Sequence, residues 1–347
     1  MQIADRTVGR QVPPFIIAEM SGNHNQSLER ALELVELAAR AGAHALKLQT
    51  YTPDTMTLDL DEREFHISDP ESPWAGRSLY DLYGEAYTPW DWHEPIFARA
   101  AELGILAFST PFDHTAVDFL EELDVPCYKV ASFENTDVAL LRRVAETGKP
   151  MIVSTGMATA EELEETVEVV RSAGCQDLVF LKCTSTYPAS PDDSNLLTIP
   201  MMRATFGCEV GLSDHTLGIG AAVASVALGA TVIEKHFTTA RADRGVDSAF
   251  SLEPAELAQL VEETDRAWRA LGTARIGPTS SEGRSLQFRR SLYVVRDLRL
   301  GDVLTPQSVR AIRPGFGLPT KHLDEVLGRS VTRDVPRGTA LTWELLD

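Results

Sequence analysis

Two histidines, His215 and His236, are the residues whose type and spacing point most directly to chemistry. Each closes a short apolar run typical of a buried strand, and residues 217–228 between the runs have a helical pattern. Consecutive parallel strands end at the same edge of a sheet, so both imidazoles would face one pocket, as the ligands of a divalent metal must. Either histidine alone would be interpreted as a hydrogen-bonded core residue, whereas the pair predicts a metal site.

The expected metal is Mn²⁺ or Mg²⁺. We expect no cysteine near the two histidines, so Glu19 or water would complete the shell of ligands. Such a shell suits a hard divalent cation better than a structural zinc site, which usually contains thiolates. Glu19 and Glu134 are also candidates for acid–base work or for contacts with substrate hydroxyls, and His24 is a further candidate for substrate contact.

Polar residues lie near the ends of the other apolar runs as well. Lys47 and Lys129 are found there together with a set of hydroxyl groups, those of Thr110, Ser132, Ser154 and Ser213. Because polar groups are costly to bury unless they are paired, their repetition at one end of every run predicts a shared polar cavity. Two ammonium groups with several hydroxyls suit a phosphate and a carboxylate. An ion pair with Glu19 or Glu134 is the alternative for either lysine.

The apolar runs also predict the fold. Eight of them alternate with amphipathic helical stretches, at residues 15–20, 45–50, 106–111, 127–132, 151–155, 178–184, 209–215 and 232–237. They are continuously apolar, as in a parallel sheet covered on both faces. Eight such units predict an α/β fold, a (β/α)8 TIM barrel over residues 1–275, with its chemistry at the carboxyl ends of the strands. An open doubly wound sheet is the alternative, disfavoured because no Gly-x-Gly-x-x-Gly follows the first strand.

Three segments depart from this pattern. Residues 51–88 are too long for an ordinary connection and rich in aromatic residues, so we expect an ordered cap over the active-site face. Residues 276–290 have the composition of a linker. Residues 291–347, with short turns and scattered glycine and proline, predict a small β-rich domain. The arginines of this domain contrast with the acidic barrel, so we expect it to dock on an acidic or anion-loaded surface.

Bulk composition argues against several classes of function. The net charge of −19 disfavours binding to nucleic acid or to an anionic membrane surface. No apolar run approaches the ~20 residues of a membrane span, and the N-terminus lacks the apolar stretch of a signal peptide. The four irregularly spaced cysteines are expected to be buried free thiols in a reducing cytoplasm.

Taken in order, these motifs resemble those of the sialic acid synthase family, whose members use phosphoenolpyruvate to make nonulosonic acids. The matching runs are Glu19 with Asn23-His24-Asn25, then KLQT at 47–50, FSTPF at 108–112, YKVAS at 128–132, STGM at 154–157, GLSDHT at 211–216 and EKHF at 234–237. The runs RPG at 313–315 and GLP at 317–319 resemble the antifreeze-like (SAF) domain of that family. The resemblance therefore implies a TIM barrel followed by a SAF domain.

Within the family, the chain most resembles the members whose product is pseudaminic acid, through residues 18–27, 49–57, 78–83, 132–136 and 248–254. Many members that make N-acetylneuraminate have asparagine before the strand-six aromatic motif, where this chain has Ser185-Thr186-Tyr187, and glycine at the position of Phe133. The implied reaction joins phosphoenolpyruvate to the open-chain aldehyde of a 2,4-diacetamido-2,4,6-trideoxy-altrose and releases phosphate by cleavage of a C–O bond. N-acetylneuraminate and legionaminic acid are the alternative products within the family.

The resemblance also implies roles for individual residues. The phosphoenolpyruvate would be held by Lys47, Thr110, Lys129, Ser132, Ser154, Ser185 and Ser213. His215 and His236 would hold the metal, and Glu19 would handle a proton. The sugar would contact Gln49, Glu134, Tyr187, Asp247 and Arg313. Arg313 would reach the barrel of a second subunit, in a domain-swapped homodimer whose C-terminal domain covers the partner's active site.

Two other interpretations stay open. A metal-dependent aldolase or isomerase on the same barrel would share the histidines but would not need two lysines and a ring of hydroxyls. A Schiff-base variant of it would need an unprotonated lysine in an apolar pocket. A non-enzymatic ice- or carbohydrate-binding role would rest on the C-terminal segment, which lacks a flat threonine-rich face, and would leave the barrel unexplained.

Overall fold

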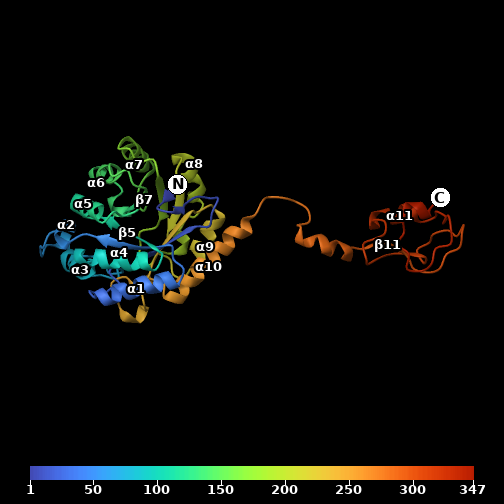
Figure 1. The fold of residues 1–347 in the computed structure, drawn as a ribbon, viewed down its shortest axis with the longest axis horizontal. Helices are drawn as coiled ribbons and strands as arrows, with labels where there is room; N and C mark the ends of the chain where they lie inside the picture. Colours follow the sequence, from blue (N-terminus) through green and yellow to red (C-terminus); the bar gives the residue numbers. More distant parts are fainter. The chain divides into compact units, whose positions relative to one another are not determined.

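A computed structural model describes residues 1–347, and the larger part of the chain is built around a closed barrel of eight parallel strands (Figure 1). The strands are β3 (Phe15–Glu19), β4 (Ala45–Thr50), β5 (Leu106–Pro111), β6 (Tyr128–Val130), β7 (Met151–Ser154), β8 (Leu178–Cys183), β9 (Glu209–Ser213) and β10 (Val232–His236). Neighbours in chain order pair with each other, and β10 pairs with β3, which places His236 opposite Glu19. The predicted TIM barrel is confirmed, and the pairing of β10 with β3 excludes the open sheet.

Helices surround the barrel: α1 (Leu28–Arg40), α4 (His93–Glu102), α5 (His114–Glu122), α6 (Val138–Ala145), α7 (Ala160–Ser172), α8 (Thr198–Phe206), α9 (Gly220–Ala227) and α10 (Pro254–Leu271). Several begin at a side chain that accepts a hydrogen bond from a free backbone N–H of the first turn, as Ser27, Asp113, Asp137 and Thr159 do. Each helix buries one apolar face against the strands, as α1 does with Ala31, Leu34, Val35 and Ala38.

Side-chain alternation along the strands separates this apolar layer from the barrel interior. Leu46 and Leu48 of β4 belong to the apolar cluster that also contains residues of α1 and α4. Successive side chains of a strand point to opposite faces, so Lys47 and Gln49 face the interior. The same alternation turns Thr110, Lys129, Ser154 and Glu234 inward, whereas Ser109 and Lys235 point to the outer face.

Six strands, β3, β6, β7, β8, β9 and β10, end one or two residues earlier than predicted. β9 ends at Ser213, so His215 lies in the following loop, where its carbonyl accepts a hydrogen bond from Ala189 N at 3.0 Å instead of joining the sheet. β6 ends at Val130, and Ser132 begins the short 3₁₀ helix η3 (Ser132–Glu134). β8 ends at Cys183. Ser132 and His215 therefore lie just beyond the barrel wall, whereas most of the other polar site residues lie in the last residues of the strands.

Residues 51–88 form an ordered cap, as expected. The cap contains α2 (Pro53–Met56), η1 (Arg63–Phe65) and α3 (Leu79–Ala86). Two buried histidines hold its ends, since Thr50 Oγ1 lies 2.7 Å from His93 Nε2 and Thr88 Oγ1 lies 3.2 Å from His24 Nε2. Gln26 N also donates to His24 Nδ1 at 3.1 Å, so both ring nitrogens have partners within the protein and the structure gives no support to a substrate contact of His24.

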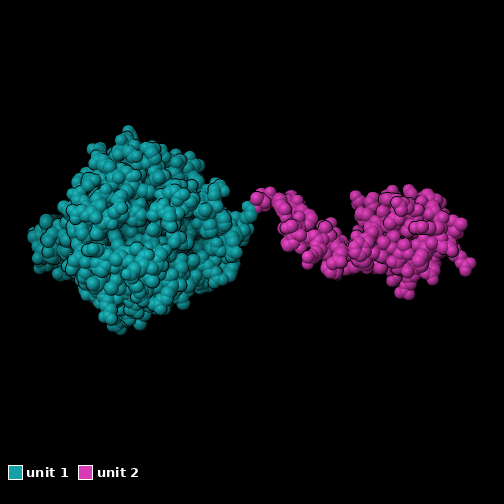
Figure 2. Space-filling model, in the orientation of Figure 1, with its two compact units in different colours: residues 1–272 teal, residues 273–347 magenta.

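The chain divides into two compact units, Met1–Gly272 and Thr273–Asp347, coloured separately in Figure 2. Unit 2 contains the antiparallel strands β11 (Ser291–Val294) and β12 (Val309–Ile312), the helix α11 (Leu323–Val326) and an apolar core of its own. The segment expected as a linker includes an exposed 3₁₀ helix, η7 (Ser281–Phe288). None of the helices combines the length and the apolar character needed to span a membrane.

The remaining elements are short. Strands β1 (Gln2–Ile3) and β2 (Arg6–Thr7) form an N-terminal hairpin. Further 3₁₀ helices are η2 (Trp90–Trp92), η4 (Pro191–Asp193), η5 (Arg241–Asp243), η6 (Ser248–Phe250), η8 (Thr320–His322) and η9 (Trp343–Leu345).

Candidate active site

Two buried lysines form the centre of the polar interior. Lys47 Nζ lies 2.6 Å from Glu19 Oε2 and donates to Thr110 Oγ1 at 3.0 Å. Lys129 Nζ donates to Ser154 Oγ at 2.7 Å. Lys47 thus makes the ion pair with Glu19 that was the alternative to an anion cradle. It does so inside the same polar interior as the hydroxyls, so its role in an anion cradle stays a prediction.

Glu234 lies between the two lysines, and sequence reasoning assigned it no role. Its carboxylate oxygens are 3.7 Å from Lys47 Nζ and 3.8 Å from Lys129 Nζ, and Ser213 Oγ donates to Oε1 at 3.1 Å. Burial alone would raise the pKa of Glu234, but the charges of Lys129 and Lys47 hold that pKa below its ordinary value. Its inward position on β10, two residues before His236, is the signal that could have identified it.

Gly156 allows two predicted hydroxyls to converge. Ser132 Oγ accepts a hydrogen bond from Gly156 N at 3.1 Å. A Cβ at position 156 would collide with Ser185 Oγ and lie 2.8 Å from Ser132 Oγ. The glycine therefore leaves room for both hydroxyls, two residues after Ser154, which binds the ammonium of Lys129.

His215 and His236 lie side by side, with ring centroids 5.4 Å apart. His215 Nδ1 donates to Thr184 O at 2.9 Å, so the lone pair of the neutral ring lies on Nε2. Burial lowers the pKa of His215, but the contact with Cys183 outweighs it and raises that pKa above its ordinary value. His236 Nδ1 is buried without a hydrogen-bond partner, 3.5 Å from Asp247 Oδ2. Burial, followed by the positive charges around it, keeps the pKa of His236 well below its ordinary value, so this imidazole is neutral.

These features fit a divalent metal, but two expectations about the residues around it need correction. The expectation that no cysteine lies near the histidines is wrong, because the inward-facing Cys183 at the end of β8 places Sγ 3.9 Å from His215 Nδ1. Glu19 is engaged by Lys47, and no third His, Cys, Asp or Glu converges with the two imidazoles as a metal-ligand set. His236 is a neutral imidazole without a hydrogen-bond partner, and His215 lies beside it with Nε2 available in its neutral form. The pair nevertheless suits a cation that keeps open coordination positions.

A hydrogen-bonded network joins Glu19 to Asp247. Gln49 Nε2 donates to Glu19 Oε1 at 2.8 Å and to Ser21 Oγ at 3.2 Å, and Ser21 Oγ donates to Asp247 Oδ2. Burial raises the pKa of Glu19 to about 7, against the opposing effect of Lys47, and raises the pKa of Asp247 to about 6. Ser21 is a further residue that sequence reasoning missed, because a serine after a strand carries no signal by itself.

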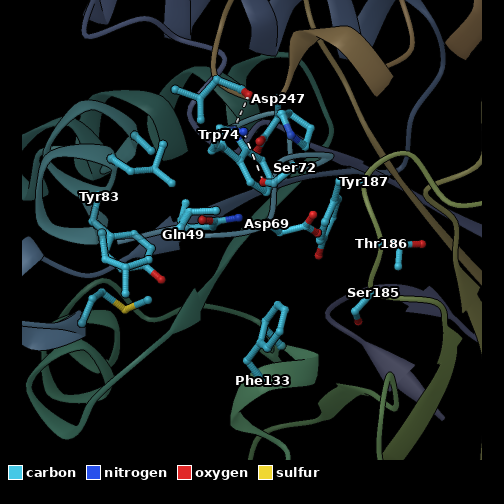
Figure 3. Close-up of a pocket in the computed structure, with 18 of the residues that line it drawn as sticks. Gln49, Asp69, Ser72, Trp74, Tyr83, Phe133, Ser185, Thr186, Tyr187 and Asp247 are labelled. Atoms are coloured by element: carbon cyan, nitrogen blue, oxygen red, sulfur yellow. Dashed lines mark hydrogen bonds between the residues drawn. The ribbon is translucent and has the colours of Figure 1, made fainter. Parts of the chain in front are cut away.

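The cavity beside this network has a volume of about 700 Å³, and its walls are mixed (Figure 3). Its polar lining includes four of the predicted residues, Gln49, Glu134, Ser185 and Asp247. Its aromatic and aliphatic lining comes largely from the cap and includes Met56, Ile67, Trp74, Leu79, Leu82, Tyr83, Phe133 and Tyr187. Trp74 Nε1 donates to Val246 O at 3.0 Å, so the cap is tied to the loop that carries Asp247.

Tyr187 also lines the cavity and connects it with the histidines. Its ring centroid is 4.5 Å from that of His215 and 5.7 Å from that of Trp74. Arg313, in contrast, belongs to unit 2, where it is exposed just after β12. Apart from His24, the structure thus brings together the predicted site residues of unit 1.

Glu134 leads to a prediction about stability. Its Oε2 is buried without a partner, and burial raises its pKa to about 7, more than Lys129 lowers it. An unfolded glutamate ionises near pH ~4.3, so the folded chain holds this proton more tightly and loses stability as the pH rises through 7. We expect Glu134→Gln to stabilise the ligand-free protein by roughly 2–3 kcal/mol more at pH 8 than at pH 5.

Urea unfolding at both pH values measures this difference. Glu146→Gln, at an exposed position of the same barrel, is the control and should show no such dependence on pH. An equal effect of Glu134→Gln at pH 5 and pH 8 would show that the carboxyl is already ionised in the folded protein.

Comparison with known proteins agrees with this geometry. A model of the NeuB family matches residues 34–275, and a model of the SAF domain matches residues 289–347. The chain is 44% identical over 341 residues to a pseudaminic acid synthase of Campylobacter jejuni subsp. jejuni serotype O:2, with 98% of each chain covered. It is 40% identical over 332 residues to a pseudaminic acid synthase of Helicobacter pylori, covering 95% of this chain and 97% of the relative.

More distant relatives have related names. An N,N'-diacetyllegionaminic acid synthase of Legionella pneumophila is 35% identical over 347 residues, covering 98% of this chain and 96% of the relative. Among solved structures, an N-acetylneuraminic acid synthetase from Leptospira borgpetersenii, in complex with citrate, aligns with a TM-score of 0.73 at 32% identity, over 83% of this chain and 95% of that one. The predicted barrel with a SAF domain is confirmed, and the chain belongs to the NeuB family.

Proposed function

We propose that the chain is a pseudaminic acid synthase. It would condense phosphoenolpyruvate with the open-chain aldehyde of 2,4-diacetamido-2,4,6-trideoxy-β-L-altropyranose, giving pseudaminic acid and phosphate. The observation that carries this proposal is the meeting, at one end of the barrel, of two buried lysines, a ring of hydroxyls and two adjacent imidazoles. The names of the relatives at 40–44% identity over almost the whole chain support the choice of product.

The lysines and hydroxyls supply the end that binds phosphoenolpyruvate. Lys47 and Lys129 would donate to its phosphate and carboxylate, together with Thr110, Ser132, Ser154, Ser185 and Ser213. Glu234 favours the charged form of both ammonium groups while that site is empty, although burial still lowers the pKa of Lys129. Substrate anions then replace solvent between groups that are already oriented, so little reorganisation is needed.

The reaction needs one carbon–carbon bond, one water and one broken C–O bond. C3 of phosphoenolpyruvate bonds to the aldehyde carbon, water adds to C2, and the C2–O bond breaks as phosphate leaves. Glu19, whose pKa is raised to about 7 by burial, is placed to accept the proton of that water near neutral pH. Gln49 holds the carboxylate of Glu19 in position through its bond to Oε1.

A divalent cation, Mn²⁺ or Mg²⁺, would be held by His215 and His236, and when bound it would polarise the aldehyde oxygen of the sugar. The buried Nδ1 of His236, which has no partner, and the neutral state of that ring support this assignment. The cap and the aromatic ring of Tyr187 would keep bulk water away from the two histidines.

The cavity supports a deoxy sugar with acetamido groups. Gln49, Glu134 and Asp247 would bind its polar groups, and Tyr187 would cover it. The substrate has three methyl groups, two from the acetamido groups and one at C6, and the aromatic and aliphatic wall formed by the cap gives these methyls apolar surroundings. A fully hydroxylated sugar would leave its C6 hydroxyl against that wall without a partner.

We also propose that two chains share each site, with Arg313 of one chain contacting an acetamido group in the barrel of the other. Charge supports this arrangement. Residues 273–347 carry 12 basic and 8 acidic side chains, whereas residues 1–272 carry 20 basic and 43 acidic ones. The four cysteines are free thiols, which supports the cytoplasm as the compartment.

Release of phosphate from phosphoenolpyruvate tests the proposed reaction. We expect release with the diacetamido-trideoxy-altrose, at least about tenfold slower turnover with N-acetylmannosamine because of its C6 hydroxyl, and loss of activity with a chelator that Mn²⁺ restores. Faster turnover of N-acetylmannosamine would instead assign N-acetylneuraminate as the product, and a preference for the sugar precursor of legionaminic acid would assign that product. Turnover of pyruvate without phosphate release would identify an aldolase.

A further inference from the structure

Behind the two histidines lies a buried ion pair that none of the proposed catalytic steps uses. Lys235 Nζ donates to Asp214 Oδ2 at 2.9 Å, to Thr216 O at 2.6 Å and to Gly218 O at 2.7 Å. Lys235 is 1% exposed and Asp214 is 4% exposed. Removing two charges from water costs several kcal/mol, so a pair buried this deeply gives little net stability even when its hydrogen bonds are satisfied. The location of the Lys235–Asp214 pair suggests a role other than stability.

The pair holds the backbone next to both histidines. Lys235 immediately precedes His236 on β10, and its side chain points to the outer face of the strand while that of His236 points inward. Asp214 and Thr216, both bonded to Lys235, flank His215. The ammonium group of Lys235 therefore fixes the chain on both sides of His215, and Lys235 itself is adjacent to His236.

No backbone pairing can replace this tie. The hydrogen bond from Asp214 N to Glu234 O, at 3.0 Å, is the last backbone bond between the β9 and β10 segments. Beyond it the chain leaves the sheet, and the loop that carries His215 and Gly218 is joined to β10 by the three bonds of Lys235. Without these bonds His215 would still be held from the β8 side, by Ala189 N and Thr184 O, but the spacing of the two rings, now 5.4 Å between centroids, would no longer be tied to β10.

We propose that Lys235 is a positioning residue that sets the separation of the His215 and His236 imidazoles for a divalent cation. The inference rests on the metal site of the proposed function. Two nitrogens that share a cation must each lie about 2 Å from it, and a site loosened by more than about 0.5 Å binds poorly. A buried side chain that joins the loop to β10 can hold the two rings to this precision, whereas a loop without such bonds cannot.

A double variant tests the proposal with little change of shape. Lys235→Met with Asp214→Asn removes both charges together, so no single charge is left buried and unpaired. The hydrogen bond from Thr216 N to Oδ1 of residue 214, now 3.0 Å, is retained by the asparagine.

Arg203→Met is the matched control. Arg203 Nη2 donates to Val210 O at 3.1 Å and to Gly229 O at 2.6 Å. It therefore ties the same two strand segments together at the opposite end of the barrel, where no metal is proposed.

Binding of Mn²⁺ alone to the purified full-length chain, measured by isothermal titration calorimetry, is the readout. We expect the double variant to raise the Kd about 10–100-fold and Arg203→Met to leave it at the wild-type value, with both variants folded by circular dichroism. A wild-type Kd in the double variant would overturn the proposal. An equal loss of affinity in Arg203→Met would also overturn it, because the effect would then be general destabilisation.

Two further measurements cover the other outcomes. If the double variant does not fold, Lys235→Gln with Asp214→Asn removes the same two charges and leaves two amides that can bond to each other. It should also raise the Kd, and a wild-type Kd there rejects the proposal. If the wild-type chain binds Mn²⁺ no better than His236→Ala does, the metal assignment of the proposed function fails and the inference falls with it. Wild-type binding that the Lys235 variants leave unchanged rejects the inference alone.

Discussion

Replacing His215 or His236 with alanine is expected to lower kcat/KM for phosphate release by roughly 10³-fold or more, because a Lewis acid at the aldehyde oxygen contributes several kcal/mol to the barrier. The fold should survive. His236 Nδ1 has no hydrogen-bond partner, and His215 gives up its bond to Thr184 O. Metal content after loading with Mn²⁺, measured by mass spectrometry, should fall together with activity.

His44→Ala is the matched control for this experiment. His44 is a partly buried histidine that precedes β4, at the opposite end of the barrel, and its Nδ1 accepts a hydrogen bond from Ile16 N at 2.9 Å. Its replacement should cost stability but leave kcat/KM nearly unchanged. Wild-type turnover in either His215→Ala or His236→Ala would remove the metal from the proposed mechanism.

The barrel and most of its site were predictable because each rests on a local signal. Continuous apolar runs such as the one that contains Lys47 indicate buried parallel strands, and a polar residue near the end of such a run is costly to bury unless it has a partner or a ligand. The TIM topology then brings together residues that are far apart in the chain, such as Lys47 and Lys129. The ends of strands were less predictable because hydrogen bonds in the loops decide where each strand stops. His215, which lies in a loop and not in β9, is an example.

What sequence reasoning missed depends on partners that only the folded chain brings together. Glu234 stood in the same strand as His236, but its position between two lysines depends on β4 and β6. Cys183 was interpreted as a buried thiol, yet its contact with His215 follows from where β8 ends. Ser21 joins Gln49 to Asp247 across more than 200 residues of sequence. Such tertiary contacts leave no pattern of spacing in a single sequence.

Deleting the chain after Gly277 is expected to leave a folded barrel that is nearly inactive, with kcat/KM reduced about 10²–10³-fold. Unit 1 has its own large apolar clusters, so it keeps its core without unit 2. Circular dichroism and thermal unfolding check the fold, and phosphate release checks activity. Full activity of the truncated chain would show that unit 2 does not take part in the site.

Arg313→Ala should reproduce part of this loss, about 10–100-fold and mainly in KM for the sugar, as expected for a hydrogen bond from a charged group. Arg310→Ala, at an exposed position on β12 in the same unit, is the control and should behave as wild type. A milder loss in Arg313→Ala than in the truncated chain would mean that other residues of unit 2 also contribute to the site.

Mixing two impaired variants, assayed at a sugar concentration well below KM, then decides whether the site is shared between chains. In a mixed dimer of Arg313→Ala and His236→Ala chains, the intact barrel of the first chain would receive Arg313 from the second. Random mixing should therefore restore about a quarter of the wild-type activity, because half of the dimers are mixed and each has one complete site. If Arg313 serves the barrel of its own chain, every barrel in the mixture lacks either Arg313 or His236, and mixing restores nothing.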